Sequence, residues 1–245
     1  MNKSKVLIGF VLLCYILFAV FELSGNDGIA YYSRSLIVPL ITLIYLLLIK
    51  DKKRLFLLFL VFYSISDLMG LVIDSMPFDE SGSLYDFNYY SGNLLYMISY
   101  LFLVIKICKS ISFKHILKHY LVHAIVLIAL NIYFIYVLQV IISPNLVVQN
   151  DYYFELAYNI VALLLLPLSL LNYFYRDNKK SLYLFLGSLC IVFSEVMDVA
   201  YIYISERGIL NFLSTTLILL AFYLLYQQSK LNNVANKNEQ FMFVD

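Results

Sequence analysis

The sequence has little charge and no tryptophan. Of its 245 residues, 13% are Asp, Glu, Lys or Arg, roughly half the usual share in soluble domains. The formal net charge is +1, so no net field recruits nucleic acid or another polyanion. The three cysteines, Cys14, Cys108 and Cys190, lie apart in apolar runs without metal or redox spacing, and we interpret them as small apolar residues. A disordered chain, a nucleic-acid binder and a disulfide-stapled secreted domain are therefore excluded.

The sequence is instead rich in hydrophobic residues. They make up 62% of the chain, and the mean hydropathy is +0.84. The 23 tyrosines and 19 phenylalanines can take the place of tryptophan at the membrane interfaces. This composition predicts an all-α polytopic membrane protein.

Apolar runs long enough to span a bilayer recur along residues 1–228 and predict one membrane domain of eight transmembrane helices. We expect the spans at Val6–Phe21, Ser35–Ile49, Leu55–Ile73, Tyr89–Ile107, Ile116–Ile142, Tyr153–Tyr175, Ser181–Ile204 and Ile209–Tyr226. The first run is expected to be an uncleaved span, because no small-residue cleavage site follows it. Pro39 is expected to kink the second, and residues 229–245 are expected to form a polar cytoplasmic tail.

The basic residues predict the orientation of these helices. With both termini in the cytoplasm, every Lys and Arg except Arg34 and Arg207 falls on the cytoplasmic side. This bias follows the positive-inside rule. The chain is thus expected in the cell (inner) membrane as a multi-pass protein whose lipid neighbours are its first partners.

The two halves of the chain share features in the same order. Pro39 recurs as Pro167, and Ser66-Asp67 recurs as Ser194-Glu195, both 128 residues later. Four spans per unit would place both units in the membrane with the same orientation. The sequence thus predicts a parallel 4+4 repeat with units 1–110 and 111–228.

Three acidic residues, Asp67, Glu195 and Asp198, fall within the expected spans. Placing such a residue at the centre of a bilayer costs ~3 kcal/mol, so each of the three is expected to have a structural or functional role. Asp67 lies about 20 Å along its helix from the cytoplasmic end, and Glu195 about 22 Å along its own. The two carboxyls are therefore expected at the same depth.

No Lys or Arg is expected deep in a span, so these acids lack an obvious basic partner. They would be protonated, share a proton, or hold a cation or cationic ligand. A protonated carboxyl is what general acid catalysis requires. Tyr63, Ser194 and Tyr201 are expected to supply hydrogen bonds. The alternative is that the acids, like buried asparagines, only join helices to one another.

Three histidines repeat every four residues, at His115, His119 and His123. This spacing on one helix face can bind a metal. However, Lys114 and Lys118 adjoin them, so an interfacial polar stripe is favoured. We expect neither a metal nor a cofactor.

The order of motifs resembles the YhhN family of eight-span membrane proteins, which includes lysoplasmalogenases. The segments that carry the resemblance are Val38-Pro39-Leu40, Tyr63-Ser64-Ile65-Ser66-Asp67, Phe193-Ser194-Glu195, and Gly92 followed eight residues later by Tyr100. In these segments Ser66 stands for a family glycine, Glu195 for an aspartate and Tyr100 for a histidine.

The resemblance implies hydrolysis of the vinyl ether of a lysolipid-like substrate. Asp67 and Glu195 would be the acid/base pair, in the manner of glycosidase carboxyls. Asp198 would orient water or bind an amine headgroup. The substrate-binding residues would be Tyr63, Ser66, Tyr100, Ser194 and Asp198.

Two other functions account for the same residues. A proton- or cation-coupled small-molecule transporter would explain intramembrane acids and a parallel repeat equally well. A structural or sensory membrane module would use the acids for packing alone.

Overall fold

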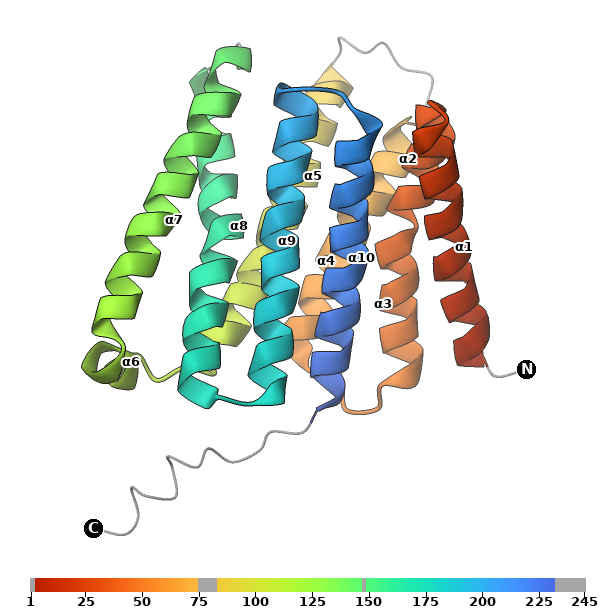
Figure 1. Ribbon diagram of the computed structural model, residues 1–245. Helices are drawn as coiled ribbons and strands as arrows, with labels where there is room; N and C mark the ends of the chain where they lie inside the picture. Colours follow the sequence, from red (N-terminus) through yellow and green to blue (C-terminus); the bar gives the residue numbers. More distant parts are fainter. Residues whose placement is uncertain (1–2, 75–82, 147–148, 232–245) are drawn as a thin grey trace.

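The computed structural model describes residues 3–74, 83–146 and 149–231 (Figure 1). Within these ranges the chain is helical, with no strand. The helices are α1 (Lys3–Leu23), α2 (Asp27–Ser35), α3 (Ile37–Leu48), α4 (Arg54–Asp74), α5 (Ser83–Cys108), α6 (Phe113–His119), α7 (Leu121–Ile142), the 3₁₀ turn η1 (Ser143–Asn145), α8 (Gln149–Arg176), α9 (Lys179–Tyr203) and α10 (Gly208–Lys230). Of the expected tail at 229–245, residues 232–245 lie outside the described part.

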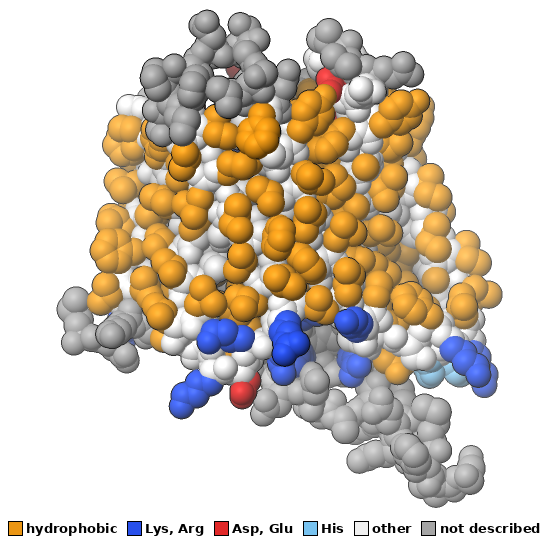
Figure 2. Space-filling model, turned by 180° about the vertical axis from the view of Figure 1, so that it is seen from behind, with side chains coloured by type: hydrophobic (Ala, Val, Ile, Leu, Met, Phe, Trp, Pro, Cys, Tyr) orange, Lys and Arg blue, Asp and Glu red, His pale blue; other side chains and the backbone are white. Residues whose placement is uncertain are grey.

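Eight segments of the described chain are long and apolar enough to cross a membrane, so the all-α multi-pass fold is confirmed. The surface agrees with this, because large apolar side chains such as Val122 (70% exposed) and Leu47 (66%) face outward. Figure 2 shows a continuous apolar band with Lys and Arg gathered along one edge. We call this edge the basic end. The chain is therefore an integral membrane protein.

Six helices pack into a closed ring in the order α3, α4, α5, α8, α9, α10, and α10 closes it against α3. Helix α1 packs outside the ring against α3 and α10, and α7 packs outside against α8 and α9. Aromatic side chains fill the middle of the ring. Phe59 and Phe222, both fully buried, stack at 5.3 Å between ring centroids, and Tyr63 lies edge-on to Phe222 at 4.9 Å.

The neighbours of the first four spans correspond to those of the last four. Helix α4 packs between α3 and α5, as α9 packs between α8 and α10, and α5 meets α8 as α10 meets α3. Asp67 and Glu195 stand on the corresponding helices α4 and α9. The 4+4 repeat itself remains a prediction, which this neighbour order agrees with.

The second span differs from the prediction, since it begins at Asp27 rather than Ser35. Asn26 caps α2 by accepting a hydrogen bond from the Ile29 amide at 3.4 Å. The chain then breaks at Leu36 and continues as α3. Pro39 accounts for this break, because its ring would crowd the Ser35 carbonyl of a continuous helix.

The expected histidine stripe on a single helix is wrong. His115 and His119 lie on α6, whereas His123 lies on α7, because the backbone turns at Tyr120 (φ −125°, ψ 22°). The fifth span accordingly begins at Leu121 rather than at Ile116.

The close packing of α9 against α10 gives a stability test. A Cβ added at Gly187 of α9 would lie 2.9 Å from Leu225 Cγ of α10. We expect Gly187→Leu to lower the free energy of unfolding by about 1–3 kcal/mol through overpacking. Thermal unfolding of the purified protein in detergent measures this. Gly9→Leu on α1, where a Cβ meets nothing within 4 Å, is the matched control; equal melting temperatures for the two variants would contradict the packing shown.

Candidate functional site

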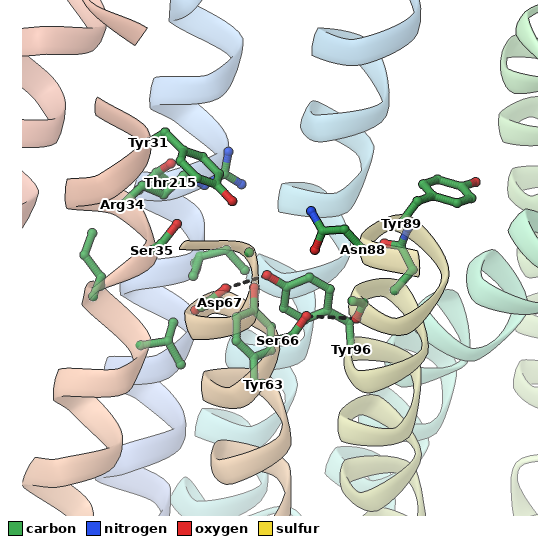
Figure 3. Close-up of a pocket in the computed structure, with 16 residues that line it drawn as sticks. Tyr31, Arg34, Ser35, Tyr63, Ser66, Asp67, Asn88, Tyr89, Tyr96 and Thr215 are labelled. Carbon is green, nitrogen blue, oxygen red and sulfur yellow. Dashed lines mark hydrogen bonds between the residues drawn. The ribbon is translucent and has the colours of Figure 1, made fainter. Parts of the chain in front are cut away.

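A cavity of about 290 Å³ lies inside the ring, between α2, α3, α4, α5 and α10. We call it the Asp67 cavity. Asp67 is its one carboxyl and Arg34 its one cation among the described residues (Figure 3). Most of the remaining lining is polar or aromatic, and it consists of Tyr31, Ser35, Ile37, Val38, Tyr63, Ser66, Gly70, Asn88, Tyr89, Gly92, Asn93, Tyr96, Thr215 and Ile218.

Asp67 is held at the cavity wall by α5. The Tyr96 hydroxyl donates to Asp67 Oδ1 at 2.5 Å, a bond drawn in Figure 3. The preceding residue, Ser66, is buried and donates to the Gly92 carbonyl of α5 at 2.8 Å. Ser66 therefore links α4 to α5 at the depth of the Asp67 carboxyl, and Asp67 itself faces the cavity.

Glu195 does not line this cavity. It accepts hydrogen bonds from the hydroxyls of Tyr100 on α5 and Tyr158 on α8, the latter at 2.9 Å. Tyr63 lies between the two acids, with its ring 4.7 Å from that of Tyr96 and 6.1 Å from that of Tyr100. The aromatic layer formed by Tyr63, Tyr96, Tyr100 and Tyr158 therefore connects the two carboxyls.

Asp198 has a basic partner, contrary to the prediction. Arg34 Nη2 lies 3.0 Å from Asp198 Oδ2 and 3.1 Å from Oδ1. The Arg34 guanidinium also donates to Asn211 of α10. The expectation failed because Asn26 starts α2 two turns earlier than the apolar run suggests, which draws Arg34 into the span. The Asp198 carboxylate is therefore paired with a guanidinium, and its expected role in binding an amine headgroup stays a prediction.

Ser194 joins helices rather than facing the cavity. It is fully buried and donates to the Ser214 carbonyl of α10 at 3.1 Å. Of the residues predicted for the site, the structure brings Tyr63, Ser66 and Asp67 together at the cavity. The other four, Tyr100, Ser194, Glu195 and Asp198, are not part of the cavity lining.

The sequence analysis did not identify several polar residues of the site, among them Arg34, Tyr96 and Tyr158. The sequence does carry a signal for Tyr96, because it lies one helical turn before Tyr100 and so shares its face of α5. Asn26-Asp27 is a helix start that would have extended the second span. Tyr158 has no comparable signal, since only the packing of α8 against α5 and α9 brings it to Glu195.

The chemistry available here is that of a carboxyl, a guanidinium and tyrosine hydroxyls. Within the described ranges, no group of three or more His, Cys, Asp or Glu could hold a metal ion. The described lining instead places one carboxyl and one guanidinium in the same cavity, with the apolar side chains of Ile37, Val38 and Ile218 beside them.

Comparisons with protein-family models, with curated proteins and with solved structures give no match to this chain. The resemblance to the YhhN family therefore rests on its motifs.

The Arg34–Asp198 pair makes a measurable contribution to folding. We expect Arg34→Gln to lower the free energy of unfolding by about 1.5–3 kcal/mol, because it leaves Asp198 without its charged donor. We expect Asp198→Asn to cost a similar amount and the double variant less than the sum of the two. Thermal or denaturant unfolding in detergent measures the cycle. Arg207→Gln, at an exposed position, is the control; strictly additive losses would contradict the pairing.

Proposed function

We propose that this integral membrane protein is a hydrolase of lysoplasmalogenase type, which cleaves the vinyl ether of a lysolipid-like substrate. The observation that carries the proposal is the Asp67 cavity, in which Asp67 is the single carboxyl of the described lining and faces a polar chamber inside an apolar bundle. The motif resemblance to the YhhN family points to the same class of reaction.

The lining suits a lipid with one chain and a phosphate. Ile37, Val38 and Ile218 offer apolar contacts to the ether-linked chain. Arg34 is held by Asp198, yet it also lines the cavity, where its remaining donors can attract a phosphate. Asn88 and Asn93 add neutral hydrogen-bonding groups for a glycerol hydroxyl.

In the proposed reaction Asp67, in its protonated form, gives its proton to the β-carbon of the vinyl ether. The electrons of the double bond form the new C–H bond and leave an oxocarbenium ion. Water adds to the cationic carbon and loses a proton to the Asp67 carboxylate. The resulting hemiacetal breaks its bond to the glycerol oxygen, which takes the hydroxyl proton, giving an aldehyde and a glycerophospho-alcohol.

Glu195 acts as a positioning residue in this scheme. Its two tyrosine partners belong to the layer that packs against Tyr63 and Tyr96, and Tyr96 holds Asp67. Glu195 would thereby keep the Asp67 side chain aimed at the cavity. The proton transfers themselves are assigned to Asp67.

Asp67→Asn tests the proposal directly. Because an amide cannot carry the transferred proton, we expect the rate of aldehyde release from a lysoplasmalogen to fall by about 10²–10⁴-fold. The assay uses purified protein in nanodiscs and an aldehyde-coupled dehydrogenase. Asp74→Asn, on the same helix but exposed and not part of the cavity lining, is the matched control and should retain full activity. Absence of aldehyde release by the wild-type protein would refute the hydrolase.

Glu195→Gln separates a positioning role from proton transfer. The amide oxygen can still accept from one tyrosine, so we expect a fall of roughly tenfold in turnover. The pH dependence of turnover should stay that of the wild-type protein, because Asp67 still carries the proton. A loss as complete as that of Asp67→Asn, or a shifted pH profile, would instead make Glu195 a proton donor or acceptor.

One structural feature favours the second candidate, a proton- or cation-coupled transporter. A further cavity lies at the basic end, and buried aromatic residues fill the ring between the two. Phe59 lies between Tyr63 of the Asp67 cavity and Leu55 of the other, and Phe222 lies between Ile218 and Gln228. Two chambers with a closed layer between them suit alternating access. Proton-coupled solute uptake into proteoliposomes, lost in Asp67→Asn and accompanied by no aldehyde release, would favour it.

A further inference from the structure

The cavity at the basic end has a charge pattern that the proposed reaction does not use. It measures about 430 Å³ and lies between α4, α5, α8, α9 and α10. We call it the basic cavity. Its six cationic residues are Lys53, Arg54, Lys106, Lys109, Arg176 and Lys180, and none of its described lining residues is a carboxylate.

Two of these cations are fixed inside the bundle by neutral groups. Lys106 Nζ donates to Gln228 Oε1 of α10 at 2.8 Å and lies 4.6 Å above the Phe56 ring. Arg176 donates from Nε and Nη2 to the Ser110 carbonyl at 2.9 and 2.7 Å. Both side chains are half-buried. Because these partners carry no charge, the positive charge at the cavity wall is not neutralised by them.

This placement differs from an ordinary positive-inside loop. Lys52 is exposed in the loop between α3 and α4 and lies outside the basic cavity, where it would serve topology alone. Lys106, by contrast, turns inward at the last turn of α5. The positive-inside rule does not require a lysine side chain to point into the bundle. Holding the Lys106 ammonium there costs part of its free energy of hydration.

The backbone adds to the same field. Helices α4 and α9 both begin at this cavity, at Arg54 and Lys179. Their N-termini carry partial positive charge. At α9 the Asn178 side chain already accepts a hydrogen bond from the Ser181 amide at 2.9 Å. The side chains of Ser181 and Ser229 complete the wall with neutral hydroxyl groups.

We propose that the basic cavity is a binding site for a phosphate group. Arginine, lysine and helix N-termini together are the groups that recognise phosphate oxygens, and the absence of a carboxylate among the described lining residues disfavours a cation. The volume lies in the range of small-molecule sites, about 300–1,000 Å³, so a phosphate with its attached group fits. The phosphate is that of a soluble anion or of an anionic lipid headgroup of the adjacent leaflet.

The test uses the full-length protein in nanodiscs of phosphatidylcholine and follows its melting temperature. Inorganic phosphate is titrated at constant ionic strength against chloride. In a second arm, part of the phosphatidylcholine is replaced by phosphatidic acid. We expect a saturable rise in melting temperature in one arm, and that arm identifies the source of the phosphate.

The variants Lys106→Gln and Arg176→Gln should weaken the apparent affinity about tenfold or more. Lys52→Gln removes the same charge at the same end outside the cavity, and it should bind as the wild type does. Arg176→Lys, which keeps the charge, should recover part of the affinity.

Three results would overturn the proposal: equal stabilisation by chloride, an equal loss in Lys52→Gln, or no saturable effect in either arm. If a glutamine variant fails to fold, the wild-type titration against chloride and the Lys52→Gln control still test whether the basic cavity binds phosphate. Aldehyde release is not part of the readout, so the hydrolase can fail while the phosphate site stands.

Discussion

The ion pair between Arg34 and Asp198 constrains the roles of the other acids. An arginine within a membrane bundle needs a counter-charge, and Asp198 supplies it at 3.0 Å with help from Asn211. Because Arg34 is paired with Asp198, it is not the hydrogen-bond partner of the other two acids. Asp67 and Glu195 accept hydrogen bonds from tyrosine hydroxyls instead. The Arg34 side chain also links α2 to α9 through Asp198 and to α10 through Asn211.

Much of the fold follows from hydropathy and charge alone. Eight spans and an all-α chain were predictable, because a bilayer demands apolar helices of a given length. The limits of that reasoning appear at Asn26 and Tyr120, where local backbone geometry moves a helix start and separates α6 from α7. Hydropathy averages over such positions and cannot resolve them.

The site was predictable in part. The cost of an acid inside a membrane singled out Asp67, and it does line a cavity. Which hydroxyl would hold it was not predictable, because Tyr63 is close in sequence whereas Tyr96 approaches across the helix pair α4 and α5. The same holds for Tyr158 and Glu195. Contacts between helices depend on rotation about each helix axis, which a polar residue in an apolar run does not specify.

The separation of Arg34 and Asp198 along the chain has a consequence for biogenesis. The two residues are 164 positions apart, so at about 5–20 residues per second the arginine is made roughly ten to thirty seconds before its counter-ion. During that interval Arg34, close to one end of its span, can extend toward the interface and remain hydrated. Retraction of this side chain into the bundle must therefore await the seventh and eighth spans, so the packing of the second span is completed only after those two have been synthesised.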